Sequence, residues 1–443
     1  MIHQKAMIKL AVLGLSISTL VAGCGTSGQG SGGNANSSGG SSGKSSSGVE
    51  NITFWDMEWG GPAYIKEAQT LVNQFNSENP SIHVTYQSIP WNNWYQTFAT
   101  ALASGTGPDV SSGAGYQPFQ FADSGNILDL SPIISDWKKS GVIDQYSSDA
   151  IKAEQYKGMQ VAIPWNLDVR MLFYNKSLFA KHNLQPPKTW DDLYKDAVAL
   201  TGNGTYGLGI ATGNNALQTL MYFILDNGGG LFTKDGKLNF VGNPKNTQAL
   251  DFLAKLSAAK AIDPAGPGWT NTSQQPSAFE KGEIAMMVGG PSSLSGMPPS
   301  EQKNVGVVPL LTSPNGSKGT IYWINGLMAY KQSKYPQADY KFLEWWSANM
   351  GKLLQTGNLL PANKQMQASS FYQSNDIYKE ALQDYIPFAK TTGAYDTSLF
   401  PQLNAIEGNN ALSDLVTKIT QNAPVGPAEQ QANSALEGIM NGN

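Results

Sequence analysis

Short apolar segments with strand character alternate with amphipathic helical segments along this chain, and this alternation restricts the folds that the chain can adopt. Residues 52–55 are expected to form a buried strand, and residues 64–75 carry apolar side chains at helical spacing. Residues 82–86 predict a second strand, and residues 94–102 predict a second helix before a third strand opens near Val110. Strands that alternate with helices in this way predict an α/β protein with mostly parallel sheets flanked by helices.

Elements of the same two kinds continue through the second half of the chain. Thr189 and Asp192 have the spacing of a capping box, which predicts the start of a helix. The remaining expected strands cover residues 161–164, 171–174, 206–211, 284–288, 305–308 and 327–330, and the remaining expected helices cover 247–259, 337–347 and 411–421. Because residues 49–443 exceed the size of one typical core, the chain is expected to fold into two domains.

The N-terminus has the features of an exported lipoprotein. Two lysines precede an uncharged apolar stretch that is shorter than the ~20 residues of a spanning helix, as in a signal peptide. This stretch ends in the sequence LVAGC at residues 20–24, which resembles the lipobox of bacterial lipoproteins and contains the only cysteine of the chain. We therefore expect residues 1–23 to be a signal peptide, Cys24 to carry acyl chains such as palmitate, and residues 24–48, rich in Gly and Ser, to form a tether. The protein would then lie on the extracellular face of the cell membrane, attached by its lipid anchor only.

The composition argues against several classes of function. The 29 basic and 33 acidic residues are scattered and give a formal net charge of −4, which does not indicate a nucleic-acid partner. Without residues 1–23 the chain keeps two histidines, and it has no nucleotide-binding glycine motif, so neither a His-based metal site nor a cofactor is expected. The one enzymatic option is a pair of carboxylates, as in glycoside hydrolases. Four carboxylates near predicted strand ends offer it: Asp56, Glu58, Asp109 and Asp168.

Aromatic side chains in predicted loops give the stronger indication of function. The chain has 11 tryptophans, and several of them stand beside Gly, Pro or Asn rather than on a periodic face. A pyranose ring packs its apolar C–H face on an aromatic ring and offers hydroxyls at its edge, so loop aromatics beside Asp, Asn and Glu predict a carbohydrate site. The stacking candidates are Trp55, Trp59, Trp91, Tyr116, Trp165, Trp269 and Trp323. The candidates for hydroxyl recognition are Glu58, Asp109, Asn166, Asp168 and Asn325.

Several motifs, in their order along the chain, resemble those of one family. They are residues 71–80, ASGTGPDV at 103–110, residues 162–165 with 172–176, TWDDL at 189–193, and FEKGEIAMM at 279–287 followed by Gly290 and Pro291. Over nearly all of residues 49–443 the chain is similar to the extracellular solute-binding proteins of ABC importers, in the sugar-binding group that includes maltose-binding protein. The resemblance implies the two-lobed fold of periplasmic binding proteins, in which hinge strands join two α/β lobes and the ligand lies in the cleft between them.

The resemblance also implies how the chain divides between the lobes. Hinge crossings are expected near residues 170–173, 321–325 and 360–364. The N-terminal lobe then comprises residues 49–170 and 325–361, and the C-terminal lobe comprises residues 171–324 and 362–443. Ser292 and Ser293 stand where maltose-binding protein has an aromatic residue. Tyr395 falls where relatives place a further aromatic, so it joins the stacking candidates.

The function that the resemblance implies is binding without chemical change. The protein is expected to be a monomer that captures an oligosaccharide and delivers it to the permease subunits of an ABC transporter. Three alternatives remain open. They are a secreted carbohydrate-active enzyme that uses paired carboxylates, a binding protein for another solute such as a polyamine, a metal complex or a peptide, and an adhesion or sensing module without a permease.

Overall fold

The structure is a computed structural model that describes residues 48–393 and 400–442. The expected signal peptide, Cys24, nearly all of the expected tether and Tyr395 lie outside the described residues. Among the described residues, no helix is both long enough and apolar enough to cross a bilayer.

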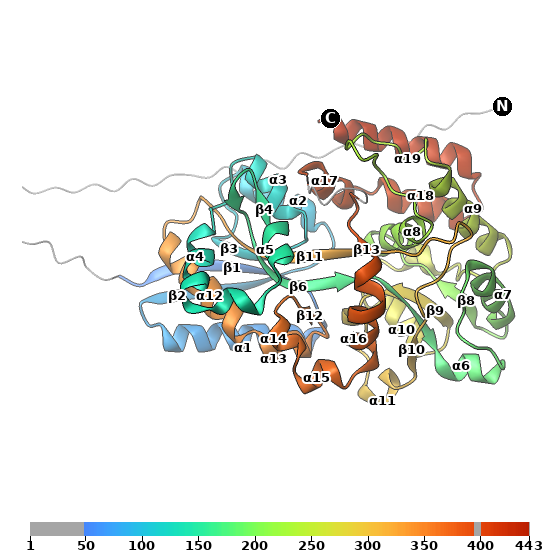
Figure 1. Ribbon diagram of the computed structural model, residues 1–443, viewed down its shortest axis with the longest axis horizontal. Helices are drawn as coiled ribbons and strands as arrows, with labels where there is room; N and C mark the ends of the chain where they lie inside the picture. The colour runs from blue at the N-terminus through green and yellow to red at the C-terminus, as the bar shows by residue number, and fades with distance from the viewer. Residues whose placement is uncertain (1–47, 394–399, 443) are drawn as a thin grey trace, which may run out of the picture. The chain divides into compact units, whose positions relative to one another are not determined.

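A sheet that starts with three parallel strands forms the first lobe (Figure 1). Its first elements are β1 (Glu50–Met57), α1 (Pro62–Glu78), β2 (Ile82–Ile89), α2 (Trp94–Ala103) and β3 (Val110–Gly113). β1 pairs in parallel with β2 and with β3. α1 starts at Pro62, whose fixed φ suits a first helical turn, and it buries the apolar stripe that the sequence predicts, including Tyr64 and Phe75. This order of strands and helices places the carboxyl ends of three strands on the same side of the lobe.

Two antiparallel strands extend this sheet and connect it to the second lobe. β6 (Ile163–Val169) pairs with β11 (Thr320–Ala329), and β11 pairs with β3, so that the strand order is β12-β6-β11-β3-β1-β2 with β12 at Leu360–Pro361. Only Arg170 separates β6 from β7 (Met171–Asn175), which belongs to the second sheet. Figure 1 shows β6 and β11 running from the first lobe toward the second, so these strands act as hinge strands.

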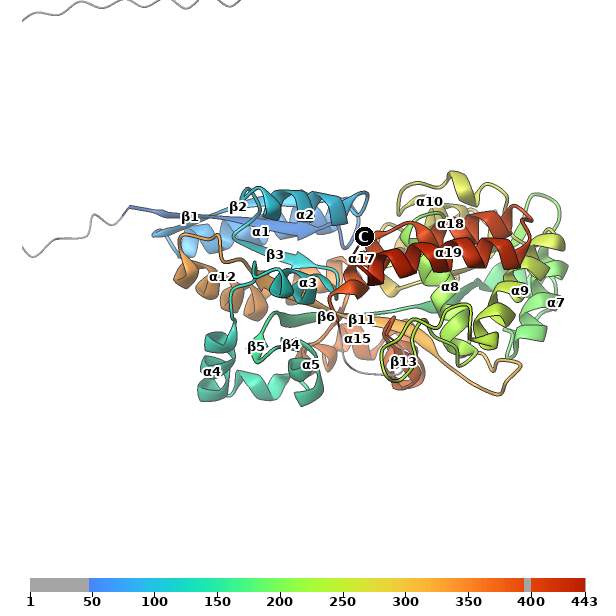
Figure 2. The same cartoon turned by 90° about the horizontal axis from the view of Figure 1, so that it is seen from above.

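The second lobe is a four-stranded sheet covered by helices. Its strand order is β10-β7-β9-β8, with β10 at Val305–Val307, β9 at Ile284–Gly289 and β8 at Tyr206–Gly209. The helices of this lobe include α7 (Trp190–Leu200), α8 (Asn214–Asp226), α9 (Pro244–Ala258), α18 (Ala411–Thr420) and α19 (Val425–Met440). α8 contacts β9, α9 and α18, and it is buried on most sides, which explains its apolar run LMYFIL. Figure 2 shows α18 and α19 side by side along one surface of the lobe.

One short helix contacts both lobes. α17 (Gln402–Gly408) touches α2 and α3 (Gln117–Asp123) of the first lobe, and it touches α8 and α19 of the second. The remaining α-helices and β-strands are α4 (Ser131–Ser140), α5 (Ser148–Ala153), β4 (Gln155–Tyr156), β5 (Met159–Gln160), α6 (Lys176–Lys181), α10 (Gln274–Glu280), α11 (Pro299–Gln302), α12 (Pro336–Asn349), α13 (Gly351–Thr356), α14 (Lys364–Gln367), α15 (Ser370–Gln373), α16 (Asp376–Glu380) and β13 (Ala389–Lys390).

The two-lobed α/β architecture agrees with the expectation, whereas the strand directions are more mixed than expected. β7 runs antiparallel to β9 and β10, and β11 runs antiparallel to β3 and β6. Strands that carry the chain from one lobe to the other and back run in opposite directions, so the hinge introduces antiparallel pairs. The capping box is confirmed, because the Asp192 N–H donates to Thr189 Oγ1 and the Thr189 N–H donates to the Asp192 carboxylate, both at 3.1 Å. The expected residue boundaries of the lobes stay a prediction.

The close packing of α7 on β8 gives a stability prediction. A Cβ at Gly207 of β8 would lie 2.2 Å from the carbonyl oxygen of Ala197 in α7. Because that oxygen cannot move without the helix, we expect Gly207→Ala to lower the free energy of unfolding by about 1–3 kcal/mol. Gly438→Ala in α19 is the matched control, since nothing lies within 4 Å of the added methyl group, and it should leave stability unchanged or raise it by up to about 1 kcal/mol. Urea unfolding measures both, and equal midpoints for the two variants would contradict the packing argument.

Candidate functional site

A cleft lies at the carboxyl ends of the parallel strands of the first lobe. The loop after β1 contributes residues 58–62, the segment after β2 contributes Trp91 and Trp94, and the loop after β3 contributes Ala114 and Gly115. Ligands of open α/β sheets bind outside the carboxyl ends of the strands. The cleft has a volume of about 430 Å³, which is within the range of small-molecule sites.

The opposite wall of the cleft comes from the second lobe and is rich in small polar side chains. Its polar residues are Asn214, Asn215 and Gln218 of α8, Thr272, Ser273, Ser277 and Glu280 at α10, and Ser292, Ser293 and Ser295 after β9. The two walls meet where the Gly61 N–H donates a hydrogen bond to Ser295 Oγ at 3.2 Å. Hydroxyl and amide groups of one lobe and aromatic loops of the other therefore line the same cleft.

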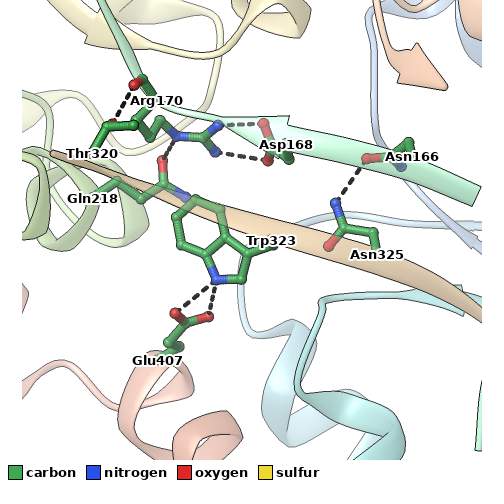
Figure 3. A network of polar contacts seen from close by, with 8 residues as sticks. All are labelled: Asn166, Asp168, Arg170, Gln218, Thr320, Trp323, Asn325 and Glu407. Carbon is green, nitrogen blue, oxygen red and sulfur yellow. Dashed lines mark hydrogen bonds and ion pairs between the residues drawn. The ribbon is translucent and has the colours of Figure 1, made fainter. Parts of the chain in front are cut away.

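A third wall, here called the hinge wall, consists of Asp168, Arg170, Trp323, Asn325 and Glu407 (Figure 3). Asp168 lies on β6, Trp323 and Asn325 lie on β11, and Arg170 lies between β6 and β7. Glu407 reaches the wall from α17. Because four of the five residues lie on or between strands, the hinge wall has the rigid support that a precise site requires.

Arg170 is the only arginine of the chain, and it joins β6, α8 and β11. Its guanidinium forms an ion pair with the Asp168 carboxylate. Arg170 Nη1 donates to Asp168 Oδ1, and Nη2 donates to Oδ2 at 3.0 Å. Its Nε donates to Gln218 Oε1 at 2.7 Å, and its guanidinium carbon lies 5.0 Å from the centroid of the Trp323 ring. The side chains of Arg170 and Asp168 are 9% and 17% exposed, so water is largely excluded from the pair. A lysine offers neither this two-pronged donor nor this planar face.

Trp323 is bound to α17 through its indole nitrogen. Trp323 Nε1 donates to both carboxylate oxygens of Glu407, at 2.8 and 3.1 Å. Thr392 Oγ1 donates to the same carboxyl group at 2.5 Å. Burial raises the pKa of Glu407 to about 7, although these two donors and the charge of Arg170 act in the opposite direction. The carboxyl group that orients Trp323 therefore titrates near neutral pH.

Tryptophans of the first lobe pack edge to face beside the cleft. The ring centroid of Trp59 lies 4.9 Å from that of Trp91 and 5.3 Å from that of Trp165, and the rings of Trp91 and Trp94 are 6.1 Å apart. Trp91 Nε1 donates to the Glu58 carbonyl oxygen at 2.9 Å. Trp59 and Trp94 are buried, whereas Trp91 is half-buried and offers the larger free surface. These contacts hold the Trp91 ring in one orientation at the cleft.

Asp56 supports Trp59 without lining the cleft. Ser112 Oγ accepts hydrogen bonds from Trp59 Nε1 at 2.9 Å and from the Met57 N–H at 3.0 Å, and it donates to Asp56 Oδ1 at 2.6 Å. The Tyr64 hydroxyl donates to the other Asp56 oxygen at 3.0 Å. Burial raises the pKa of Asp56 to about 7 against the effect of these donors. An acidic side chain therefore orients a cleft tryptophan in this lobe as well.

The structure brings six of the predicted site residues to the cleft: Glu58, Trp59, Trp91, Asp168, Trp323 and Asn325. It places six others away from the lining of the cleft: Trp55, Asp109, Tyr116, Trp165, Asn166 and Trp269. The expectation for Asp109 is corrected because this residue precedes β3 and so lies at the amino end of a parallel strand. Its carboxylate accepts hydrogen bonds from the Thr53 N–H at 2.7 Å and from Thr53 Oγ1 at 2.8 Å.

Burial corrects the expectation for three more residues. Trp165 and Tyr116 are 0% and 1% exposed, and the Tyr116 hydroxyl accepts a hydrogen bond from the Thr392 N–H at 2.9 Å. Asn166 is fully buried, and its Oδ1 accepts a hydrogen bond from Asn325 Nδ2 at 2.9 Å. Trp165 and Asn166 therefore support cleft residues from behind and offer no surface to a ligand in this structure.

Packing against neighbouring elements removes the last two tryptophans from the cleft. Trp55 packs edge to face on Phe98 of α2, with the ring centroids 5.3 Å apart. The Trp269 ring lies 3.2 Å from the position that a Cβ on Gly209 would take at the end of β8. Both tryptophans are partly buried against the core, and neither lines the cleft.

The cleft also contains residues that reasoning from the sequence missed. They are Trp94, Arg170, Gln218, Glu280 and Glu407. A signal for Arg170 was present, because a single arginine among many lysines marks a position that requires a guanidinium. No comparable signal marked Glu407, whose partner Trp323 lies 84 residues earlier in the chain.

The ionisable groups of the cleft are mostly acidic. Four carboxyl groups line it, from Glu58, Asp168, Glu280 and Glu407, and Arg170 is the one basic residue among its described lining residues. Because Asp168 neutralises Arg170, the remaining acids give the cleft an excess of negative charge. Within residues 48–393 and 400–442, no three His, Cys, Asp or Glu side chains are grouped so that they could hold a metal ion.

Comparison with known proteins identifies the family. The model of the family described as bacterial extracellular solute-binding protein matches residues 61–352. The chain belongs to this family. The resemblance seen in the sequence is therefore confirmed.

Relatives of this solute-binding protein include solved and curated proteins. A sugar transporter from Arthrobacter chlorophenolicus, solved with bound laminaribiose, is 30% identical with a TM-score of 0.82, and the match covers 87% of this chain and 98% of that structure. The diacetylchitobiose binding protein DasA of Streptomyces coelicolor is 25% identical over 406 residues, which cover 88% of this chain and 89% of the relative. A putative binding protein of Brucella abortus is 25% identical over 380 residues, covering 81% and 84% of the two chains.

The ion pair in the hinge wall gives a second stability prediction. Arg170→Met leaves the largely shielded Asp168 carboxylate without its partner, so we expect the free energy of unfolding to fall by about 3 kcal/mol. Arg170→Lys keeps the charge but loses the second donor and the bond to Gln218, so a smaller loss of about 1 kcal/mol is expected. Urea unfolding of these variants measures both losses.

The double variant Arg170→Met with Asp168→Asn is the matched control. Removal of both charges should restore part of the stability that Arg170→Met loses, because no unpaired carboxylate remains. If Arg170→Lys proves as stable as the wild type, the two-pronged contact contributes nothing and the argument fails.

Proposed function

We propose that this solute-binding protein captures an oligosaccharide in the cleft and delivers it to the permease subunits of an ABC transporter. The observation that carries this proposal is one cleft that combines the free surface of Trp91 with hydrogen-bonding groups of Asp168, Asn325 and Ser293. Aromatic rings pack on the apolar faces of sugar rings, while polar side chains bind the hydroxyls at their edges. Movement of the lobes about the hinge strands would close the cleft over the sugar without any change in its bonds.

The charge of the cleft supports an uncharged sugar as the ligand. The carboxyl groups of Glu58, Glu280 and Glu407 have no basic partner among the residues described as lining the cleft, because Arg170 is engaged by Asp168. A sugar phosphate or a uronic acid would bring its own negative charge next to these carboxyl groups. It would give up its hydration without finding a free basic side chain among the described lining residues. Neutral hydroxyls can instead donate hydrogen bonds to these carboxylates.

The ligands of two relatives support the same class of ligand. The Arthrobacter structure holds laminaribiose, and the Streptomyces relative is named for diacetylchitobiose. The alternative of a carbohydrate-active enzyme has less support, because Asp168 is bound by Arg170 and Glu407 is bound by Trp323 and Thr392. A cleft dominated by tryptophans and small hydroxyl residues also suits a sugar better than a polyamine or a peptide.

Further parts of the proposal concern the whole chain. We propose that Glu58, Trp59, Trp91, Asp168, Trp323 and Asn325 contact the ligand. We also propose that the protein works as a monomer whose lobes divide at the boundaries expected from the sequence. The lipobox-like sequence that ends at Cys24 supports attachment to the outer face of the cell membrane.

Binding of neutral sugars is the main prediction. A thermal-shift screen of the full chain with laminaribiose, diacetylchitobiose and maltotriose should raise the melting temperature with at least one sugar, because a ligand of the folded state stabilises it by mass action. Trp91→Ala should then weaken binding about tenfold to hundredfold in calorimetry, through loss of the stacking surface. Trp345→Ala is the matched control, since Trp345 lies on α12 and bonds to Glu78 outside the cleft.

Three results would count against this function. They are an unchanged melting temperature with every neutral sugar, a preference for glycerol 3-phosphate or a uronic acid oligomer, and equal affinity of wild type and Trp91→Ala. If chromatography shows that the sugar is converted during incubation with the purified protein, the result would support the alternative of a carbohydrate-active enzyme.

Lipid attachment is tested separately at Cys24. In cells that process lipoproteins, the wild-type chain should incorporate labelled palmitate and sediment with membranes, whereas Cys24→Ser should do neither because the thiol that is acylated is absent. Sugar affinity of Cys24→Ser should equal that of the wild type. Incorporation of palmitate into Cys24→Ser would refute attachment at this residue.

A further inference from the structure

The ring of Trp323 is held from several sides at the hinge wall (Figure 3). The Arg170 guanidinium carbon lies 5.0 Å from the ring centroid, and a Cβ on Gly115 would lie 3.2 Å from Trp323 Cβ, so the loop after β3 adjoins the same residue. The indole N–H points to Glu407, and both of its bonds are 3.1 Å or shorter. Trp323 is only 5% exposed, so the small surface that it offers to the cleft depends on these contacts.

Packing of α17 holds Glu407 in place. α17 contacts α2, α3, α8 and α19. Asn404 Nδ2 of this helix donates to Gln120 Oε1 of α3 at 2.6 Å, and Gly408 lies against the Tyr95 ring of α2. The carboxyl group of Glu407 is therefore presented to Trp323 by a helix that is anchored on both lobes.

The surroundings of Glu407 favour a carboxylate that accepts hydrogen bonds. Its described partners, Trp323 Nε1 and Thr392 Oγ1, both donate to it. Three ionisable groups face it from the neighbouring elements. Arg170 favours the charged form of Glu407 and Asp168 disfavours it, while the negative charge of Glu407 in turn raises the pKa of the Tyr116 hydroxyl.

We propose that Glu407 is a positioning residue for the ligand: its carboxylate orients the Trp323 indole in the cleft, and its protonation weakens this hold, so that ligand affinity depends on the charge of Glu407. This inference rests on the proposed function, because it takes Trp323 to contact the bound sugar.

The chemistry of the hydrogen bond gives the direction of the effect. The ionised carboxylate accepts the indole N–H with both oxygens in a charge-assisted bond. When the Glu407 oxygen that faces Thr392 is protonated, the Trp323 N–H keeps only one acceptor, the uncharged second oxygen of Glu407. We expect the weaker hydrogen bond to lower the affinity of the protein for the sugar by about fivefold. Because the pKa of Glu407 is about 7, affinity should rise with pH as the group ionises.

The unliganded protein provides the first test. Selective 15N labelling of the tryptophan side chains in the full chain, with Trp323→Phe to assign the signal, reports the Trp323 Nε1–H resonance. In the wild type this resonance should titrate near pH 7, and in Glu407→Gln it should not. Thr392→Val should move the titration to higher pH, because the ionised form loses a donor. Glu429→Gln is the matched control, since Glu429 is a buried glutamate that accepts a hydrogen bond from Thr247 Oγ1 at 3.0 Å in the second lobe.

Calorimetry provides the second test. With laminaribiose as the probe, wild type and Glu429→Gln should bind about fivefold more tightly at about pH 8 than at about pH 6, and Glu407→Gln should lack this part of the change. Asp56 acts on Trp59 through Ser112 in all three proteins, so any contribution from it is common to them.

The outcomes of the two tests separate this inference from the proposed function. An indole resonance that does not titrate, or identical pH profiles for wild type and Glu407→Gln, overturns the inference even if the sugar binds. A titrating resonance in a protein that binds no neutral sugar overturns the proposed function and supports the coupling between Glu407 and Trp323.

Discussion

The ion pair between Arg170 and Asp168 holds the cleft together at the point where the chain passes from one lobe to the other. Removal of a guanidinium from water costs several kcal/mol, and two parallel hydrogen bonds to one carboxylate offset this cost only when the geometry is well fixed. Since Arg170 also binds Gln218 and lies over Trp323, the requirement for a fixed geometry extends to β6, α8 and β11. The position of the hinge wall therefore depends on one side chain.

Acidic side chains play the same part on the two sides of the cleft. Asp56 orients Trp59 through the Ser112 hydroxyl, and Glu407 orients Trp323 directly. A carboxylate that loses contact with water is unfavourable unless it accepts hydrogen bonds, and each of these two acids has donors that compensate for the lost water. Rings that are oriented before a ligand arrives lose less conformational entropy on binding, so the same aromatic surface gives a higher affinity.

The sequence was sufficient where stability is local. The apolar stripe of α1 and the cap formed by Thr189 and Asp192 depend on spacings within a single helix, and both were predicted correctly. Reasoning from sequence was less successful for the site, because it could not tell which strand ends or which face of a strand would meet at the cleft. Asp109 stands before β3, as the sequence predicts, but this is the amino end of a parallel strand, whereas the cleft lies at the carboxyl ends. Trp165 points into the core, although Asp168 of the same strand lines the cleft. The contact between Trp323 and Glu407 joins residues 84 positions apart, and no pattern along the chain reports such a contact.

Anchorage of α17 on both lobes has a mechanical consequence. If the lobes rotate about the hinge strands and the helix follows α19, then its contacts with α2 and α3 shift, including the hydrogen bond from Asn404 to Gln120. If it follows the first lobe, it must slide over α8 and α19. In the first case the carboxyl group of Glu407 travels relative to β11, which belongs to the sheet of the first lobe, so that the angle between the lobes and the tilt of one indole ring are geometrically linked.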